Sequence, residues 1–166
     1  MKKCILWLPL LLLLWGCGEQ EVFEQVQDVY QVMALQPGIL SVDIPADAVV
    51  TAMGSGQEDT IYFCDGYTLA VQTMSGGDLS KTVAELTGFL PEQLTVFPIP
   101  DESVKRYALA WTCAGEGGDQ VGRMILLDDG AFHYAVTVMC PAETAGKCSA
   151  AWDALLDSVK IDHTGT

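Results

Sequence analysis

The chain of 166 residues contains no asparagine, few basic residues and only two histidines. The absence of asparagine excludes N-linked glycosylation, which requires that residue as its acceptor. Eight Lys and Arg residues stand against 22 Asp and Glu residues, which gives a formal net charge of −14. An acidic domain is repelled by nucleic-acid phosphates and by anionic lipid headgroups. We therefore predict no nucleic-acid binding and no membrane attachment through a basic patch.

Motifs of common catalytic and cofactor sites are also missing. The sequence has no glycine motif for phosphate or dinucleotide binding and no paired C-x-x-C spacing for zinc. His163 is close to the C-terminus, so a Ser-His-Asp site would have to use His133. The Gly-Ser-Gly stretch at 54–56 lacks the Gly-x-Ser-x-Gly pattern of a nucleophile elbow. We interpret His133 as a histidine on a strand face and predict no catalytic residue, metal or cofactor.

Three acidic pairs offer carboxylates for acid–base chemistry or for calcium: Glu58-Asp59, Asp101-Glu102 and Asp128-Asp129. Each pair lies in a predicted loop or turn, where solvated carboxylates are common, and none has the spacing of a calcium loop. We therefore interpret all three pairs as solvated turn residues.

A single long apolar run is present, and it lies at the start of the chain. Lys2 and Lys3 precede 11 uncharged residues from Ile5 to Trp15. A helix that spans a bilayer needs about 20 apolar residues, so this run is too short to span as a helix. Its length and its positive end are typical of a secretory signal peptide. The sequence therefore predicts export.

The run ends in Leu14-Trp15-Gly16-Cys17, which resembles the lipobox of bacterial lipoproteins. Trp15 departs from the pattern, because that position normally holds a small or β-branched residue. The resemblance implies that the Cys17 thiol receives a diacylglyceryl group and that cleavage occurs just before it. Residues 1–16 would then be the signal peptide, and lipid on Cys17 would hold the protein on the outer face of the cell membrane. The alternative is an ordinary membrane-anchoring helix in which the cysteine is incidental.

Residues 17–38 form a predicted connector. Val22, Val26, Val29 and Met33 recur with helical spacing, and Pro37-Gly38 ends the pattern. This predicts a short amphipathic helix that docks on the domain or binds a partner. The domain itself is predicted to cover residues 39–163.

Within the domain, apolar and polar residues alternate over several short runs, which predicts strands at 39–44, 60–64, 67–74, 94–99, 106–113, 121–127 and 132–140. Asp65-Gly66 between two such runs predicts a tight hairpin. Prolines in and after the run at 94–99 predict that this strand lies at a sheet edge. The segment 47–59 is predicted as a loop.

Helical spacing predicts one helix from Leu79 to Leu90, begun by Asp78, and a last helix with Cys148, Trp152, Leu155, Leu156 and Val159 on its inner face. Hairpins dominate the order of elements, which favours a mainly antiparallel sheet. The fold class is therefore predicted as α+β, with the sheet covered by two helices.

The stretch "AFHYAVTVMCPAETAGKCSAAWDALLDSVKI" resembles the end of PsbP-like domains, and "ILSVDIPADAVV" resembles their opening strand. These domains close with a strand, a short loop and a helix of the form W-x-x-L-L-x-S-(V/F)-x-(I/V). The resemblance covers Ile39 to Ile161 and rests on core positions, so it implies a fold more than a function. Many bacterial lipoproteins carry such a domain without known chemistry.

Four cysteines remain in the domain: Cys64, Cys113, Cys140 and Cys148. In an exported chain they allow two disulfides in three connectivities. We expect Cys113, Cys140 and Cys148 to gather at one end of the core, with Cys140–Cys148 as the first candidate pair and Cys113–Cys148 as its competitor. Cys64 would pair with the remaining cysteine or stay free. The alternative is that all four are buried thiols that pack as small hydrophobic side chains.

Taken together, these features predict a non-enzymatic envelope protein, anchored through lipid on Cys17, that binds or assembles an envelope protein partner. A second hypothesis is a small-ligand carrier with a cleft between sheet and helix. A third is a hydrolase that uses His133 or paired carboxylates.

Overall fold

The computed structural model describes residues 36–53, 59–101, 103–115 and 117–162. The predicted signal peptide, the lipidation residue Cys17 and the predicted amphipathic helix lie outside the described residues. Within the described part of the chain, no helix is long and apolar enough to cross a membrane.

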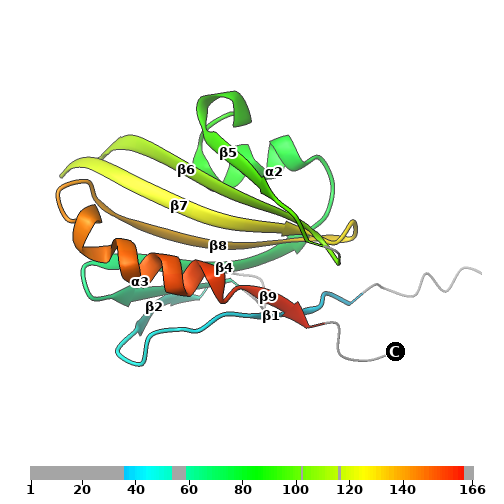
Figure 1. Ribbon diagram of the computed structural model, residues 1–166, viewed down its shortest axis with the longest axis horizontal. Helices are drawn as coiled ribbons and strands as arrows, with labels where there is room; N and C mark the ends of the chain where they lie inside the picture. Colours follow the sequence, from blue (N-terminus) through cyan, green and yellow to red (C-terminus); the bar gives the residue numbers. More distant parts are fainter. Residues whose placement is uncertain (1–35, 54–58, 102, 116, 163–166) are drawn as a thin grey trace, which may run out of the picture. The chain divides into compact units, whose positions relative to one another are not determined.

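The main structure is an antiparallel sheet of seven strands in the order β2-β3-β4-β8-β7-β6-β5 (Figure 1). A second, two-stranded sheet pairs β1 with β9. In the main sheet, strands that follow one another in the chain also lie side by side and are joined by hairpins, with the exception of β4 and β5. The strands are β1 Ile39–Ser41, β2 Val49–Met53, β3 Thr60–Cys64, β4 Tyr67–Ser75, β5 Thr95–Ile99, β6 Lys105–Gly115, β7 Gly118–Asp128, β8 Phe132–Pro141 and β9 Lys160–Asp162.

Two α-helices, α2 (Leu79–Thr87) and α3 (Ala145–Asp157), pack on opposite faces of the sheet. Alternate residues of β8 explain this arrangement, because successive side chains of a strand point to opposite faces. Val136 and Val138 belong to the core cluster under α3, whereas Ala135 belongs to the cluster under α2. The predicted α+β class, with a mainly antiparallel sheet and two covering helices, is therefore confirmed.

Helix α2 begins where the sequence predicts. The Asp78 carboxylate accepts a hydrogen bond from the backbone N–H of Ser80 at 2.9 Å, as expected of an N-cap. The helix ends at Thr87 rather than near Leu90, because Gly88 takes a left-handed conformation with φ of 77°. A short 3₁₀ turn, η1 (Pro91–Gln93), then leads into β5.

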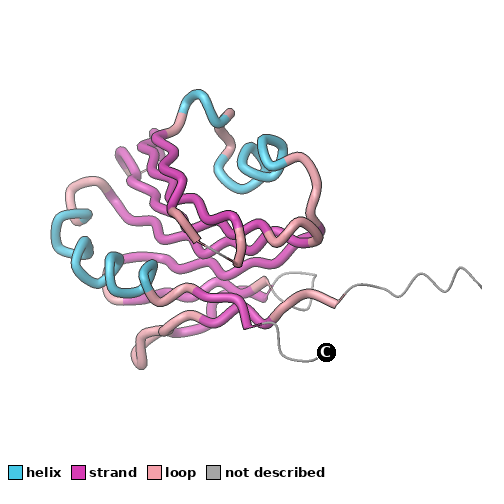
Figure 2. The backbone as a smooth tube through the Cα atoms, turned by 45° about the vertical axis from the view of Figure 1, so that its right-hand side comes forward, coloured by secondary structure: helices cyan, strands magenta, loops and turns pink. Residues whose placement is uncertain are grey.

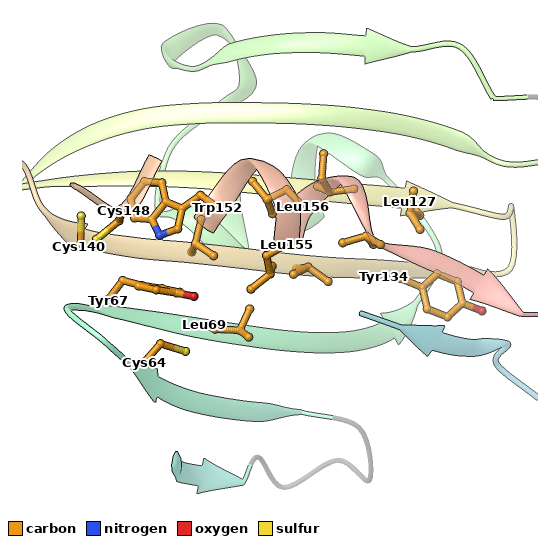
Figure 3. Packing of buried hydrophobic residues seen from close by; sticks show 14 of the residues in the cluster. Cys64, Tyr67, Leu69, Leu127, Tyr134, Cys140, Cys148, Trp152, Leu155 and Leu156 are labelled. Carbon is orange, nitrogen blue, oxygen red and sulfur yellow. The ribbon is translucent and has the colours of Figure 1, made fainter. Parts of the chain in front are cut away.

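Helix α3 contributes a fully buried tryptophan to the core. Trp152 is buried against β4, and its ring meets that of Tyr67 edge-on, with centroids 6.1 Å apart (Figure 3). At the other end of the helix, the Arg106 guanidinium of β6 donates to the carbonyl oxygens of Leu156 and Val159, at 2.9 and 2.7 Å. The bond to Leu156 satisfies an acceptor that a helix end leaves without a partner, and the bond to Val159 fixes the chain just after the helix.

The sequence did not reveal two strands, β2 and β9, and it overestimated the length of β1. β2 lies in the segment 47–59 that was predicted as a loop, and it pairs with β3. All five of its residues are exposed, so no face of the strand has to be apolar, and the sequence VVTAM shows no alternation of apolar and polar residues. β9 has only three residues and exists through its pairing with β1, which ends at Ser41 rather than at position 44.

Candidate functional site

His133 was the one histidine in a position to support catalysis, and it lies on the predicted face of β8. Its ring is 1% exposed, its Nδ1 is 2.8 Å from the Thr82 hydroxyl of α2, and its Nε2 is 3.8 Å from an Asp128 oxygen. The order hydroxyl, imidazole, carboxylate matches a catalytic triad, but the last distance is too long for a hydrogen bond. Thr82 is also buried, so a substrate has no access to its hydroxyl. The contact instead ties α2 to the sheet.

The acidic pair Asp128-Asp129 does not behave as a pair of solvated carboxylates. Asp129 accepts hydrogen bonds from the backbone N–H groups of Ala131 and Phe132 and from the Tyr134 hydroxyl, at 2.7–2.8 Å. Asp128 accepts from the backbone of the same turn and from the Lys105 ammonium at 3.1 Å. The pair organises the β7–β8 turn. Within the described residues no group of three or more His, Cys, Asp and Glu side chains is placed to hold a metal ion.

The cysteines do not gather as expected. Cys64, Cys140 and Cys148 lie in the core cluster under α3 (Figure 3). Cys113 packs against the cluster under α2 instead. The reason is the strand register: Cys140 lies opposite Val121, and Cys113 lies opposite the next residue, Gln120. Adjacent positions point to opposite faces. The expected grouping of Cys113 with Cys140 and Cys148 is therefore wrong, and Cys64 takes its place.

All four thiols are free in the structure. Burial raises the pKa of the Cys148 thiol, and the neighbouring Cys140 adds to the increase. Burial also raises the pKa of Cys64, against the lowering effect of a hydrogen bond with Tyr67. A thiol with a raised pKa is mostly protonated at neutral pH and is a poor nucleophile. These cysteines therefore suit packing or a structural disulfide better than covalent catalysis.

The hollows of the surface bear on the small-ligand hypothesis. Between α2 and the sheet there is a cavity of only about 100 Å³, whereas sites for small molecules usually measure about 300–1,000 Å³. Larger hollows, of about 500 and 480 Å³, lie beside the β5–β6 connection and between α3 and the β3–β4 hairpin. The second of these is lined in part by Cys64, Tyr67, Lys147 and Cys148.

Among the described residues, no helix covers one half of a sheet face. Helix α2 packs on side chains of β6, β7, β8 and the end of β4, and no residue of β2 or β3 belongs to that cluster. Both views show α2 beside β5 and β6, away from β2 (Figures 1 and 2). We call the uncovered region the open half-face; the register places these residues on it: Val49, Ala52, Ile61, Phe63, Thr68 and Ala70.

The open half-face is apolar and lacks charge. Phe63 is 54% exposed and lies opposite Val49, which is 62% exposed. β2, β3 and β4 contain no Lys, Arg, Asp or Glu residue. Carboxylates lie just beyond these strands, at Asp47, Asp59 and Asp65. A large exposed apolar surface with a polar border is typical of an interaction site. The sequence did not reveal this surface, because it depends on β2 being a strand and on which strands α2 covers.

Comparisons with known proteins identify the fold. No protein-family model matches the chain, and no curated protein matches it. Its structure is similar to that of cyanobacterial PsbP (CyanoP) from Synechocystis sp., with a TM-score of 0.53 and 9% sequence identity over 89% of this chain and 98% of that one. The fold is PsbP-like.

Two further structures are similar. A protein from Bacteroides thetaiotaomicron matches with a TM-score of 0.51 and 10% identity over 76% of this chain, which spans only 46% of that protein. LpqN, described as involved in cell envelope biogenesis of Mycobacterium tuberculosis, matches with a TM-score of 0.48 and 12% identity over 76% of this chain and 86% of that one. This last similarity is too weak to add to the argument. Likeness at such low identity assigns a fold and no function.

Proposed function

We propose that the protein is an exported, lipid-anchored envelope protein whose domain binds a partner protein without catalysing a reaction. The observation that carries the proposal is the open half-face. Monomeric proteins seldom leave a continuous apolar surface without a purpose, and this one spans adjacent strands and includes the exposed side chains of Phe63 and Val49. Aromatic side chains such as Phe63 are enriched in protein interfaces.

The chemistry of the domain supports a non-catalytic function. Its buried histidine is hydrogen-bonded to Thr82, and burial raises the pKa of the Cys64 and Cys148 thiols. The turn carboxylates are occupied by backbone N–H groups. The histidine and the turn carboxylates serve the fold. Cys64 and Cys148 line the hollow between α3 and the β3–β4 hairpin, but burial raises the pKa of both thiols and makes them poor nucleophiles.

The anchor is proposed from the sequence. The net charge of −14 gives the domain no electrostatic attraction to an anionic membrane, so attachment requires another device. Acyl chains on Cys17 would supply it, because two or more chains hold a protein stably on a bilayer. The location on the outer face of the cell membrane follows from the same proposal.

Site-specific crosslinking in native membranes tests partner binding. A photoreactive amino acid at position 63 is expected to capture a discrete protein. A matched control places the same group at Phe97, which is 60% exposed on β5 at the opposite edge of the sheet. Capture at both positions or at neither would contradict the proposal that the open half-face is the binding surface.

A second candidate function is favoured by one observation. The hollow of about 480 Å³ between α3 and the β3–β4 hairpin has the volume of a small-molecule site. A carrier would be stabilised by its ligand, because a molecule that binds only the folded state raises the free energy of unfolding. A rise in melting temperature in a small-molecule library, abolished by Ala151→Trp in that hollow, would favour this function.

A further inference from the structure

The two edges of the main sheet differ in how they are protected. Edge strand β5 contains Pro98, which has no N–H to offer and so blocks pairing with another strand. The other edge strand, β2, has the sequence VVTAM, with neither proline nor a charged residue. Proteins commonly use those residues to prevent an edge from pairing with foreign strands. The β2 edge therefore remains open to pairing.

The side chains of β2 are also exposed on both faces. Val49 lies on the open half-face, and Val50, which is 50% exposed, points to the face of α3. A bulge between Val50 and Ala52 interrupts the pairing with β3, but the two valines precede it. An added strand would cover apolar side chains on both faces and pair the free backbone groups of β2.

The charges near β2 define what could be added. Asp47 lies just before the strand, and Asp59 adjoins its far end, where Met53 pairs with Thr60. β2 and β3 carry no cation between these two carboxylates. A second copy of the chain would bring acidic groups against acidic groups in either strand direction. The complementary occupant has Lys or Arg at its ends.

We propose that β2 accepts an additional strand from the partner: an extended segment with apolar side chains at alternate positions and basic residues at both ends. Main-chain hydrogen bonds would give the segment its affinity, and contacts with Val49 and Phe63 would select its side chains. This inference rests on the proposed function, since it specifies how the partner binds.

A synthetic peptide with the sequence Lys-Arg-Val-Thr-Ile-Thr-Val-Lys-Arg provides the probe. It is added, up to about 1 mM, to the full lipidated chain in nonionic detergent micelles, and amide hydrogen exchange is measured. We expect protection of amides in β2 and no change in β5. A matched peptide with Asp and Glu in place of the four basic residues should bind about fivefold or more weakly at low salt. Equal binding of the two peptides, or protection that omits β2, would overturn the proposal.

Proline substitutions test the role of the backbone. Successive N–H groups of a strand point to opposite sides, so one of Val49→Pro and Val50→Pro removes an outward N–H and the other removes an N–H that faces β3. The outward variant should keep the wild-type melting temperature and lose peptide protection of β2. The control is Val96→Pro on β5. Val96 lies two residues before Pro98, so its N–H points to the same side of the strand as the Pro98 nitrogen. This substitution should leave peptide binding to β2 unchanged.

The crosslink from position 63 separates failure of this inference from failure of the proposed function. If the outward proline variant folds and still gives the wild-type crosslink, partner binding stands and strand addition is wrong. If the peptide protects β2 but the wild-type chain gives no crosslink in membranes, the edge accepts strands and the proposed function is wrong. Loss of both peptide protection and crosslink in the folded variant supports the inference.

Discussion

His133 illustrates how a single residue can suggest chemistry that its environment does not permit. It is enclosed by α2 and β8, where Thr82 shares a hydrogen bond with it and Asp128 lies 3.8 Å away. A buried polar group that loses its partner costs about 1–3 kcal/mol in stability. The residue therefore contributes to the attachment of α2.

We predict that His133→Ala lowers the free energy of unfolding by about 1–3 kcal/mol. The variant should still give the crosslink from position 63 at temperatures where it is folded, because the open half-face does not include the histidine. Denaturant unfolding and crosslinking measure the two effects. Thr82→Val, which removes the same hydrogen bond from the other side, is the control; a binding defect in both folded variants would indicate a function for the pair.

The thiols give a second prediction at the scale of residues. Cys140 and Cys148 lie close enough for Cys140 to raise the pKa of Cys148, and Cys113 is on the other face of the sheet. We expect Cys140–Cys148 to be the disulfide that forms on oxidation, with a stabilisation of about 2–3 kcal/mol. The raised pKa of Cys148 means that little of it is thiolate at neutral pH. Disulfide formation should therefore become faster as the pH rises, because more of the attacking thiolate is then present.

Peptide mapping of the exported, unreduced protein checks this pairing. A crosslink that contains Cys113 would contradict the register of β6 and β7, and four alkylatable thiols would show that no bond forms. A bond between Cys64 and Cys148 would show that the hairpin, rather than the end of β8, approaches α3 most closely.

At the scale of elements, the end of α3 depends on one side chain from the sheet. Arg106 donates to two carbonyl groups there and carries a charge, whereas Arg123 forms an exposed ion pair with Asp153 on the same helix. Hydrogen bonds from charged groups contribute about 1.5–3 kcal/mol, and exposed ion pairs about 0–1 kcal/mol.

We predict that Arg106→Met destabilises the protein by about 1.5–3 kcal/mol, while the matched variant Arg123→Met costs less than about 1 kcal/mol. Equilibrium unfolding in urea at low and high salt separates the two, because only the effect of Arg123→Met should shrink as salt screens the ion pair. Similar losses in both variants would argue that the Arg106 bonds are weaker than their geometry indicates.

At the scale of the whole molecule, a strongly negative chain carries an apolar and uncharged surface, the open half-face. Net charge of one sign keeps copies of an acidic protein apart. Four neighbouring strands, β2, β3, β4 and β8, nevertheless contain no Lys, Arg, Asp or Glu residue. The charged side chains thus lie outside the surface that we propose for binding, and Asp47, Asp59 and Asp65 lie at its border.

The proposed lipid anchor would determine where that surface acts. We predict that Cys17→Ala leaves the protein unprocessed or releases it from the membrane, since no basic patch can replace the lipid. Metabolic labelling with radioactive palmitate, followed by fractionation, measures both effects. A control substitution at Cys4, in the predicted signal peptide, should change neither. If the wild-type chain incorporates no label, the lipobox interpretation is wrong.

The sequence by itself determined the features that depend on near neighbours in the chain. The hairpin at Asp65-Gly66, the start of α2 at Asp78 and the strands from 106 to 140 follow from turn residues and from periodicities of two or about 3.6. These features require no knowledge of distant contacts, and they sufficed for the α+β class.

Only the tertiary structure decided which strands have partners and which surfaces are covered. β2 and β9 lack a local signal and exist through pairing with β3 and β1. The position of Cys113 depended on strand register, where a shift of one residue reverses every side chain. The open half-face depended on the length and position of α2, which covers one half of the face and leaves the other exposed. Pairing, register and coverage join residues far apart in the chain, and a pattern of near neighbours carries no information about them.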